Sequence, residues 1–386
     1  MNNFKMICVR VLSVCVGLIL FLGSNAQDNK MIQIIYLSDV HYGLTKKVFR
    51  GKENVSSDEV NKAILKEINN LQKQILPSDN GVGQNQMINH IDALIVTGDL
   101  ANREEKGIQS ATKSWAQFEK NYIKDLHTKD RFGKITPIYL TPGNHDASNA
   151  IGYFKPLNPS RDNKSMVEIY NRMLHPHILK TTTTFDYEKD VPNYAINIGS
   201  IHLIFPSIWP DSANRIWMEN DLNNVKRNTP VLIFTHVPPY GDPKLFTNPN
   251  IPATINSKNK FENLLREKYK ESLVIDKYAK DSIEQNGLDI FLYKHPNIKA
   301  YFHGHENHNE FYTYKGVDGK LSLPVFRVDS PMKGSISSKD EIKCSFQLIT
   351  IDENKRLLSV RECLYNAHPN EKDQNITWGV SKTISL

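Results

Sequence analysis

Short apolar runs alternate with helical patterns in the first half of the chain. Three runs rich in β-branched residues are predicted strands: Gln33–Ser38, Asp92–Thr97 and Ile135–Thr141. After the first of them, Ser56 or Ser57 can cap a helix whose apolar residues recur every three or four positions. A second helix, before the third strand, places Trp115, Phe118 and Tyr122 on its inner face. This alternation is typical of a layered α/β fold.

The second half of the chain is expected to complete the same arrangement. Two apolar runs separated by Gly199-Ser200 predict a β-hairpin, and a helix follows over Ala213–Val225. Further strands are predicted just before His236 and over Ile298–Phe302. Only β-like segments come after them.

Two irregular or helical stretches interrupt this pattern, near residues 147–191 and 241–289. Both are long for plain connections, so we expect them to form a lid or a wall of the substrate site. The remainder predicts a single domain over residues 27–386 that carries a C-terminal β-hairpin near 343–365.

The first 26 residues differ from the rest of the chain, which has an ordinary globular composition of 39% hydrophobic and 23% charged residues. Their only charges are Lys5 and Arg10, ahead of the apolar run Val11–Leu22. Ser24–Ala26 then offers small residues where a signal peptidase cuts. We therefore expect a cleavable signal peptide and a mature protein that is secreted or periplasmic.

Charge and hydropathy limit the kinds of partner expected for the mature chain. The apolar run in the leader is shorter than the ~20 residues of a membrane-spanning helix, and no transmembrane segment is expected elsewhere. Removal of Lys5 and Arg10 lowers the net charge from +6 to +4. The remaining charges are scattered, so the sequence predicts no nucleic-acid patch, although a mild positive charge can attract an anionic substrate.

Two cysteines, Cys344 and Cys363, remain after removal of the leader. They lie in two β-patterned runs joined by the turn-like segment Asp352–Lys355. A hairpin centred on that segment would place the two cysteines opposite each other. An exported chain permits a disulfide there, and two buried free thiols are an equal alternative.

Five short polar motifs follow one another along this framework. In chain order they are Asp39-Val40-His41, Gly98-Asp99, Gly143-Asn144-His145-Asp146, His236 in a Thr-His-Val-Pro-Pro run, and Gly304-His305 followed closely by His308. Asp, Asn and His are ligands of first-row metals. Three of the motifs directly follow an apolar run, so their side chains are expected at the carboxyl ends of strands, where open α/β sheets bind ligands. The ordered set predicts a cage for two metal ions.

With these motifs the chain resembles the calcineurin-like metallophosphoesterase superfamily. That superfamily includes purple acid phosphatases, cyclic-nucleotide and glycerophosphodiester phosphodiesterases, and acid sphingomyelinases. The resemblance extends from about Gln33 to Tyr365, with only a shared strand–helix rhythm between motifs. It implies two mixed β-sheets packed as a sandwich with flanking helices, a four-layer α/β fold. It also implies a site for two divalent or mixed-valence ions of Mn, Fe, Zn or Co, a set that oxygen and imidazole ligands accommodate.

The resemblance assigns roles to individual residues. Asp39 and His41 match ligands of the first metal, and Asp99 matches the carboxylate that bridges both metals. The residues that match ligands of the second metal are Asn144, His236 and His305.

The last motif departs from the Gly-His-X-His pattern of the family, because Gly304–His308 has one residue too many. A local bulge would let His308 complete the first site, and this is the reading we favour. Alternatively, Asn307 takes that place through its amide oxygen. A third frame uses His303 and His305 and lacks the preceding glycine.

The expected chemistry accounts for these residue types. Two metals ~3.5–4 Å apart can hold a bridging hydroxide that attacks phosphorus while they clamp the phosphate oxygens. A carboxylate at Asp99 can bridge two cations, and the neutral Asn144 limits the negative charge. His145 resembles the non-ligand histidine of the family, a catalytic residue that protonates the leaving oxygen or stabilises the phosphoryl charge. Asp146 is expected to tie its own loop.

The branch of the superfamily is indicated by the residues around the bridging carboxylate. Purple acid phosphatases carry a tyrosine where this chain has Asn102, and the Gly98–Leu100 run is more similar to phosphodiesterase branches. We therefore expect hydrolysis of small phosphate esters, diesters more than monoesters. Exported relatives of this kind act on nucleotides, phospholipid head groups or glycerophosphodiesters. The alternatives are an acid phosphatase-like monoesterase and a catalytically degenerate protein that binds metal or a phosphorylated ligand.

Overall fold

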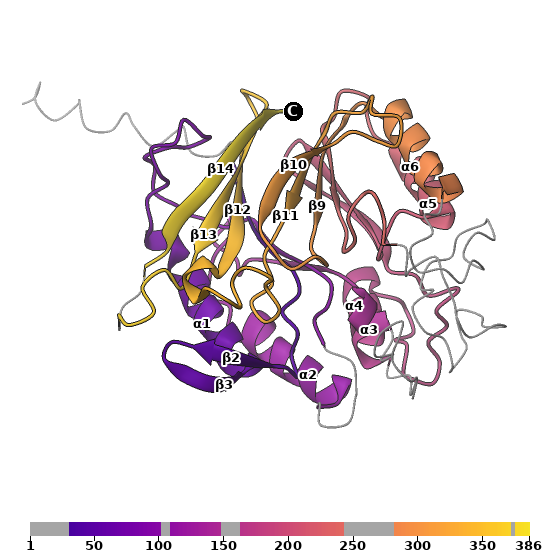
Figure 1. Cartoon of the computed structure of the whole chain (residues 1–386). Coiled ribbons are helices and arrows are strands. Elements are labelled where there is room, and N and C mark those ends of the chain that lie inside the picture. The colour runs from indigo at the N-terminus through magenta and orange to yellow at the C-terminus, as the bar shows by residue number, and fades with distance from the viewer. Residues whose placement is uncertain (1–30, 102–108, 148–162, 243–281, 372–374) are drawn as a thin grey trace, which may run out of the picture.

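Two six-stranded mixed sheets form the centre of the molecule (Figure 1). The computed structural model describes residues 31–101, 109–147, 163–242, 282–371 and 375–386. In the first sheet the strand order is β14-β13-β12-β1-β4-β5, and in the second it is β10-β11-β9-β8-β7-β6.

The first sheet combines three parallel strands with an antiparallel C-terminal meander. The parallel strands are β1 (Met31–Leu37), β4 (Ala93–Thr97) and β5 (Ile138–Thr141). The antiparallel strands are β12 (Ser345–Asp352), β13 (Leu357–Leu364) and β14 (Thr377–Ser385). Because β1, β4 and β5 run the same way, their carboxyl ends meet at one edge of the sheet.

The second sheet has a parallel centre with one antiparallel strand at each edge. Its central strands are β7 (Ile201–Pro206), β8 (Val231–Phe234), β9 (Ile298–His303) and β11 (Leu323–Arg327). Its edge strands are β6 (Asn193–Ile198) and β10 (Glu310–Tyr314).

Aromatic and β-branched side chains fill the space between the two sheets. Phe234 of β8 and Phe302 of β9 stack with their ring centroids 4.5 Å apart. Tyr36 of β1 meets both rings edge-on, at 5.6 and 5.5 Å. Such a dry, interdigitated layer fixes the two sheets face to face.

Helices cover the outer faces of both sheets, which gives four layers (Figure 1). The first sheet is covered by α1 (Ser57–Asn70) and α2 (Ala111–Phe118), the latter continued by a π-helical turn over Glu119–Lys124. The second sheet is covered by α5 (Ser212–Leu222) and α6 (Ser282–Lys294). The predicted two-sheet α/β sandwich is therefore confirmed.

Several local features differ from the sequence expectation. A hairpin of β2 (Thr45–Phe49) and β3 (Lys52–Ser56) lies between β1 and α1, where no strand was predicted. The helix α4 (Lys164–Leu174) lies in the first irregular stretch, and α6 extends out of the second. Residues 1–30, 148–162 and 243–281 are outside the described part, so the signal peptide, part of the first stretch and most of the second remain predictions. None of the helices that the structure describes is long and apolar enough to cross a bilayer.

The two cysteines do not face each other, contrary to the prediction. Cys363 is opposite Phe346, and the backbone of Cys344 bonds to Tyr365 instead. The turn includes Arg356, whose φ of 53° is left-handed, so the hairpin is centred one residue later than expected. That shift moves the register by two residues. Both thiols are buried and free.

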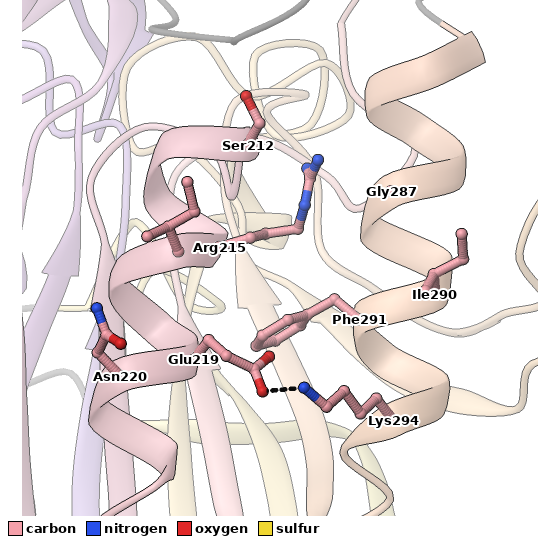
Figure 2. A pocket seen from close by; sticks show the side chains of 9 residues that line it. Ser212, Arg215, Glu219, Asn220, Gly287, Ile290, Phe291 and Lys294 are labelled. Atoms are coloured by element: carbon pink, nitrogen blue, oxygen red, sulfur yellow. Dashed lines mark hydrogen bonds and ion pairs between the residues drawn. The ribbon is translucent and has the colours of Figure 1, made fainter.

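A groove of about 450 Å³ lies between α5 and α6, on the outer side of the second sheet (Figure 2). An ion pair between Lys294 and Glu219 bridges the two helices, and Arg215 pairs with Glu284 at 2.9 Å. None of the predicted metal ligands lines this groove.

Candidate metal centre

The ends of five strands bring the predicted site residues together. The segments after β1, β4, β5, β8 and β9 carry Asp39, His41, Asp99, Asn144, His145, His236 and His305. Backbone bonds join these loops: the N–H of Asp39 donates to Gly98 O (3.0 Å), and that of His41 donates to Asp99 O (2.9 Å). The N–H of Gly304 donates to His236 O (3.0 Å). The motifs of both sheets therefore form one continuous cluster.

Four of these residues have left-handed backbone conformations. The φ angles are 55° at Asp39, 42° at His41, 52° at Asp99 and 67° at His305. Such angles are strained for residues other than glycine, and strain of this kind gathers at functional sites. Gly304 permits close approach, since a Cβ there would collide with Ser38 and Asp39 side-chain atoms. The motifs thus adopt tightly turned backbone conformations that direct their side chains into the cluster.

Asp99 lies at the centre of the cluster. Its Oδ2 is 3.6 Å from His41 Nε2 and 3.5 Å from His236 Nε2. Two groups of side chains have ligand atoms close enough to hold an ion: His41, Asp99 and His145, and Asp39, Asp99 and His236. Asp99 belongs to both groups, as a carboxylate between two ions would. Neither group equals one predicted ligand set, because the first contains His145 and the second joins Asp39 to His236.

Asn144 joins the cluster through its amide oxygen. That oxygen is 3.2 Å from His236 Nε2 and 3.2 Å from His305 Nδ1. The two imidazole nitrogens are also 3.2 Å from each other. The structure therefore brings together the three residues that match ligands of the second metal.

In two of the histidines, a hydrogen bond to the ring nitrogen that points away from the cluster orients the other ring nitrogen toward it. His236 Nδ1 is 2.8 Å from Thr97 O, so that nitrogen donates and Nε2 faces the cluster with its lone pair. His305 Nε2 is 2.8 Å from Asp242 Oδ2, which leaves Nδ1 facing inward. A carboxylate behind a metal-binding histidine fixes the tautomer and raises its basicity.

Replacing Asp242 by alanine should therefore weaken metal binding at this half of the centre. The expected loss is roughly 10–100-fold in affinity for one of two ions, which is typical of such supporting carboxylates. Titration of the metal-free protein by calorimetry measures it. An Asp318→Ala variant, changed at an exposed turn, is the matched control. Unchanged affinity for both ions in Asp242→Ala would show that the contact to His305 has no such role.

Several buried atoms in the cluster have no hydrogen-bond partner among the residues that the structure describes. They are Asp39 Oδ1 and both ring nitrogens of His41, and both residues are fully buried. Leaving a buried polar group unpaired costs about 1–3 kcal/mol, so such atoms call for a partner such as an ion. Carboxylate and imidazole groups are donors that suit Mn, Fe, Zn or Co. The residues present therefore fit a metal centre.

The electrostatics of the cluster support the same conclusion. Burial alone would raise the pKa of Asp99, but the neighbouring His236 and His145 lower it well below its usual range. Burial would lower the pKa of His236, yet the charges of Asp99 and Asp39 raise it to about 9. In His41, burial and the charge of Lys333 lower the pKa. Asp39 and Asp99 are thus ionised and His41 is in the neutral form that a metal requires, whereas His236 keeps a proton that a bound metal would displace.

Asp146 ties its own loop, as the sequence suggested, and also bonds to the loop after β4, which was not predicted. Its carboxylate accepts from the N–H groups of Leu100 (3.1 Å), Ala101 (3.0 Å) and Gly143 (2.9 Å). It is nearly fully buried, and burial together with the charge of Asp99 raises its pKa to about 7. Its role is to hold the loops after β4 and β5 in register.

Asp146→Ala is therefore expected to reduce the free energy of unfolding by about 2–4 kcal/mol, because three buried N–H groups lose their acceptor. Denaturant unfolding of the metal-free protein measures this loss. Asp146→Asn should lose less, since its amide oxygen still accepts. Equal stability of the alanine variant and the parent would contradict this role.

The two candidates for the last ligand of the first metal, His308 and Asn307, have different neighbours. The His308 ring contacts Arg327, lies 3.9 Å from Glu310 and bonds to Glu306 O at 3.1 Å. Asn307 Nδ2 donates to His305 O (2.9 Å), while its buried Oδ1 has no hydrogen-bond partner in the described part of the chain.

The third frame considered for this motif uses His303. That ring is buried and lies 2.9 Å from both Gly304 O and the Tyr312 hydroxyl. Both of its nitrogens thus have neighbours outside the cluster.

His145 lies on the more open side of the cluster. Its ring Nε2 is 3.9 Å from Asp99 Oδ2, and its backbone N–H donates to Asp99 Oδ1 at 2.8 Å. Its ring packs edge-on against His41, with centroids 4.9 Å apart. The side chain keeps 15% of its surface exposed, so it can reach both the cluster and an entering ligand.

Two polar residues at the site were not predicted. Asp242 supports His305, and Lys333 Nζ lies 3.1 Å from His145 Nε2. Asp242 lies six residues after His236, and this closeness to a motif was its one signal in the sequence. Lys333 lies near none of the five motifs in the sequence, so it had no such signal. Asn102 lies outside the described residues.

Comparisons with known proteins agree with this geometry. The sequence profile of the calcineurin-like phosphoesterase family matches residues 32–309, which include all the candidate site residues. The chain therefore belongs to the calcineurin-like phosphoesterase family. No curated protein sequence matches it significantly.

Several solved structures are similar to this chain at low identity. A protein from Streptococcus pneumoniae described as a phosphoesterase is 10% identical, with a TM-score of 0.33, over 92% of this chain and 98% of that one. A calcineurin-like phosphoesterase from Bacillus subtilis is 12% identical, with a TM-score of 0.30, over 92% and 90%. A protein from Staphylococcus aureus described as a 5′-nucleotidase is 12% identical, with a TM-score of 0.39, over 92% of this chain. The match spans 54% of the length of that last protein.

Proposed function

We propose that this chain is an exported, dinuclear metal-dependent phosphoesterase that hydrolyses small phosphate esters, diesters more readily than monoesters. The observation that carries the proposal is Asp99, which is buried and belongs to two groups of ligand atoms at once. Export rests on the leader pattern of residues 1–26, and the preference for diesters rests on the Gly98–Leu100 run.

When bound, a pair of metal ions supplies positive charge for the phosphate oxygens and activates the attacking water. The residues of the chain position and assist this chemistry. Asp99 would hold both ions. His145, exposed beside the cluster, is placed to donate a proton to the leaving oxygen.

The ligands of the two ions are proposed from the same geometry. Asp39 and His41 would hold the first ion, together with His308 or Asn307. The contacts of His308 with Arg327 favour Asn307, whose buried oxygen has no hydrogen-bond partner among the described residues. The second ion would be held by Asn144, His236 and His305.

Hydrolysis of paired chromogenic phosphate mono- and diesters by the mature protein tests the function. The protein is first reconstituted with Mn, Zn or Fe, and Asp99→Asn serves as the inactive control. Metal-dependent turnover that is faster with the diester is the expected result. Faster turnover of the monoester would reassign the chain to an acid phosphatase-like activity.

A metal- or phospho-ligand-binding protein without turnover is the second candidate. The contacts of His308 with Arg327 and Glu310 favour it, because a first site that lacks its last histidine can bind metal poorly. Such a protein would bind about one ion per chain and hydrolyse neither ester.

A further inference from the structure

Lys333 approaches the open side of the metal centre from a segment that contains none of the ligand motifs. Its Nζ is 3.1 Å from Nε2 of His145. Asp39, His41 and His236 are fully buried, whereas His145 remains 15% exposed. The ammonium group thus lies beside the one proposed catalytic side chain and on the side from which a ligand can enter.

The segment that carries Lys333 is anchored to the metal site. Ser330 Oγ donates to Asp39 O and accepts from the N–H of Lys333, each at 2.9 Å. Two further bonds hold the segment: Lys46 Nζ to Pro331 O at 2.7 Å, and Ser335 N to Asn307 O at 2.6 Å. The base of the Lys333 side chain is therefore fixed to the loops that also carry the ligands.

The chemistry of this position suits a phosphate group. A lysine ammonium carries three N–H donors, so it can contact His145 and a phosphate oxygen at the same time. Donors aimed at the place where charge develops act strongly when they are already positioned and partly shielded from water. The ammonium group would add its positive charge to that of the metal ions on the entrance side, which favours capture of an anion.

We propose that Lys333 binds the phosphoryl oxygens of the substrate beside His145 and is a further catalytic residue of this site. This inference rests on the proposed phosphoesterase function and deepens it by assigning a phosphate-binding side chain. It concerns a position that lies outside all five ligand motifs.

Binding of inorganic phosphate to the metal-loaded protein tests the assignment without requiring turnover. Lys333→Met should weaken phosphate binding about tenfold by calorimetry, the loss of one charge-assisted contact, with metal content unchanged. Lys333→Arg should restore most of the affinity. Lys339→Met removes the same charge from an exposed position six residues away and should bind phosphate as the parent does.

Kinetics separate this assignment from the proposed function. Lys333→Met should lower kcat/KM for the ester roughly 10–100-fold, mostly in kcat, because the contact strengthens as charge develops. Phosphate affinity in Lys333→Met equal to that of the parent, or loss of bound metal from that variant, would overturn the assignment. Phosphate binding that depends on Lys333 in a protein without esterase activity would instead refute the enzyme and leave the binding residue in place.

Discussion

Replacing Asp99 by asparagine is expected to remove bound metal and turnover together. The Asp99 carboxylate is shared by the two groups of ligand atoms, and an amide can neither bridge two cations as well nor offset their charge. We expect kcat/KM to fall by at least about 10³-fold and the metal content to drop by at least one ion per chain.

The fold should survive this substitution, because the amide has the same shape and still accepts the His145 N–H that lies 2.8 Å from Oδ1. The stability of the metal-free variant should stay within about 1 kcal/mol of that of the metal-free parent. Asp318→Asn, at an exposed turn, is the control for the chemical change alone. An Asp99→Asn protein that keeps two ions and full activity would refute the bridging role.

Replacing His145 by glutamine should have the second largest effect, and it should spare the metals. His145 lies at the edge of the buried cluster and is expected to serve as the proton donor, so kcat should fall about 10²–10⁴-fold. Metal analysis and steady-state kinetics on the same sample separate this result from that of Asp99→Asn.

The leaving group distinguishes proton donation from general charge stabilisation. A nitrophenolate leaves without much help, so His145→Gln should affect a nitrophenyl ester less than an alkyl ester. His177→Gln, at an exposed loop position, is the matched control and should behave as the parent. Equal losses for both esters would assign His145 to charge stabilisation, and no loss for either would remove it from the mechanism.

The clustering of most candidate ligands could be predicted because they follow directly after strands. Asp39, Asp99 and His236 each come after a run whose apolar pattern marks a buried strand, and parallel strands end at one edge. The same reasoning predicted the two sheets and the helices that cover them. Local sequence is sufficient to predict the position of a side chain when its motif directly follows a helix or strand.

The features that escaped prediction depend on irregular backbone or on contacts between distant segments. Lys333 reaches His145 across 188 residues of sequence, and Asp242 reaches His305 across 63. No periodic pattern encodes such contacts. The cysteine register failed for a similar reason, since a single left-handed residue, Arg356, lengthens the turn and shifts the pairing.

The most direct test of the central claim is turnover of the diester as a function of metal equivalents added to the metal-free mature protein. A dinuclear phosphoesterase predicts activity that rises with added metal and reaches its plateau at two ions per chain. A plateau at one ion per chain would contradict the two-metal site. Absence of turnover at any ratio, in a protein that binds the metal, would contradict the enzyme.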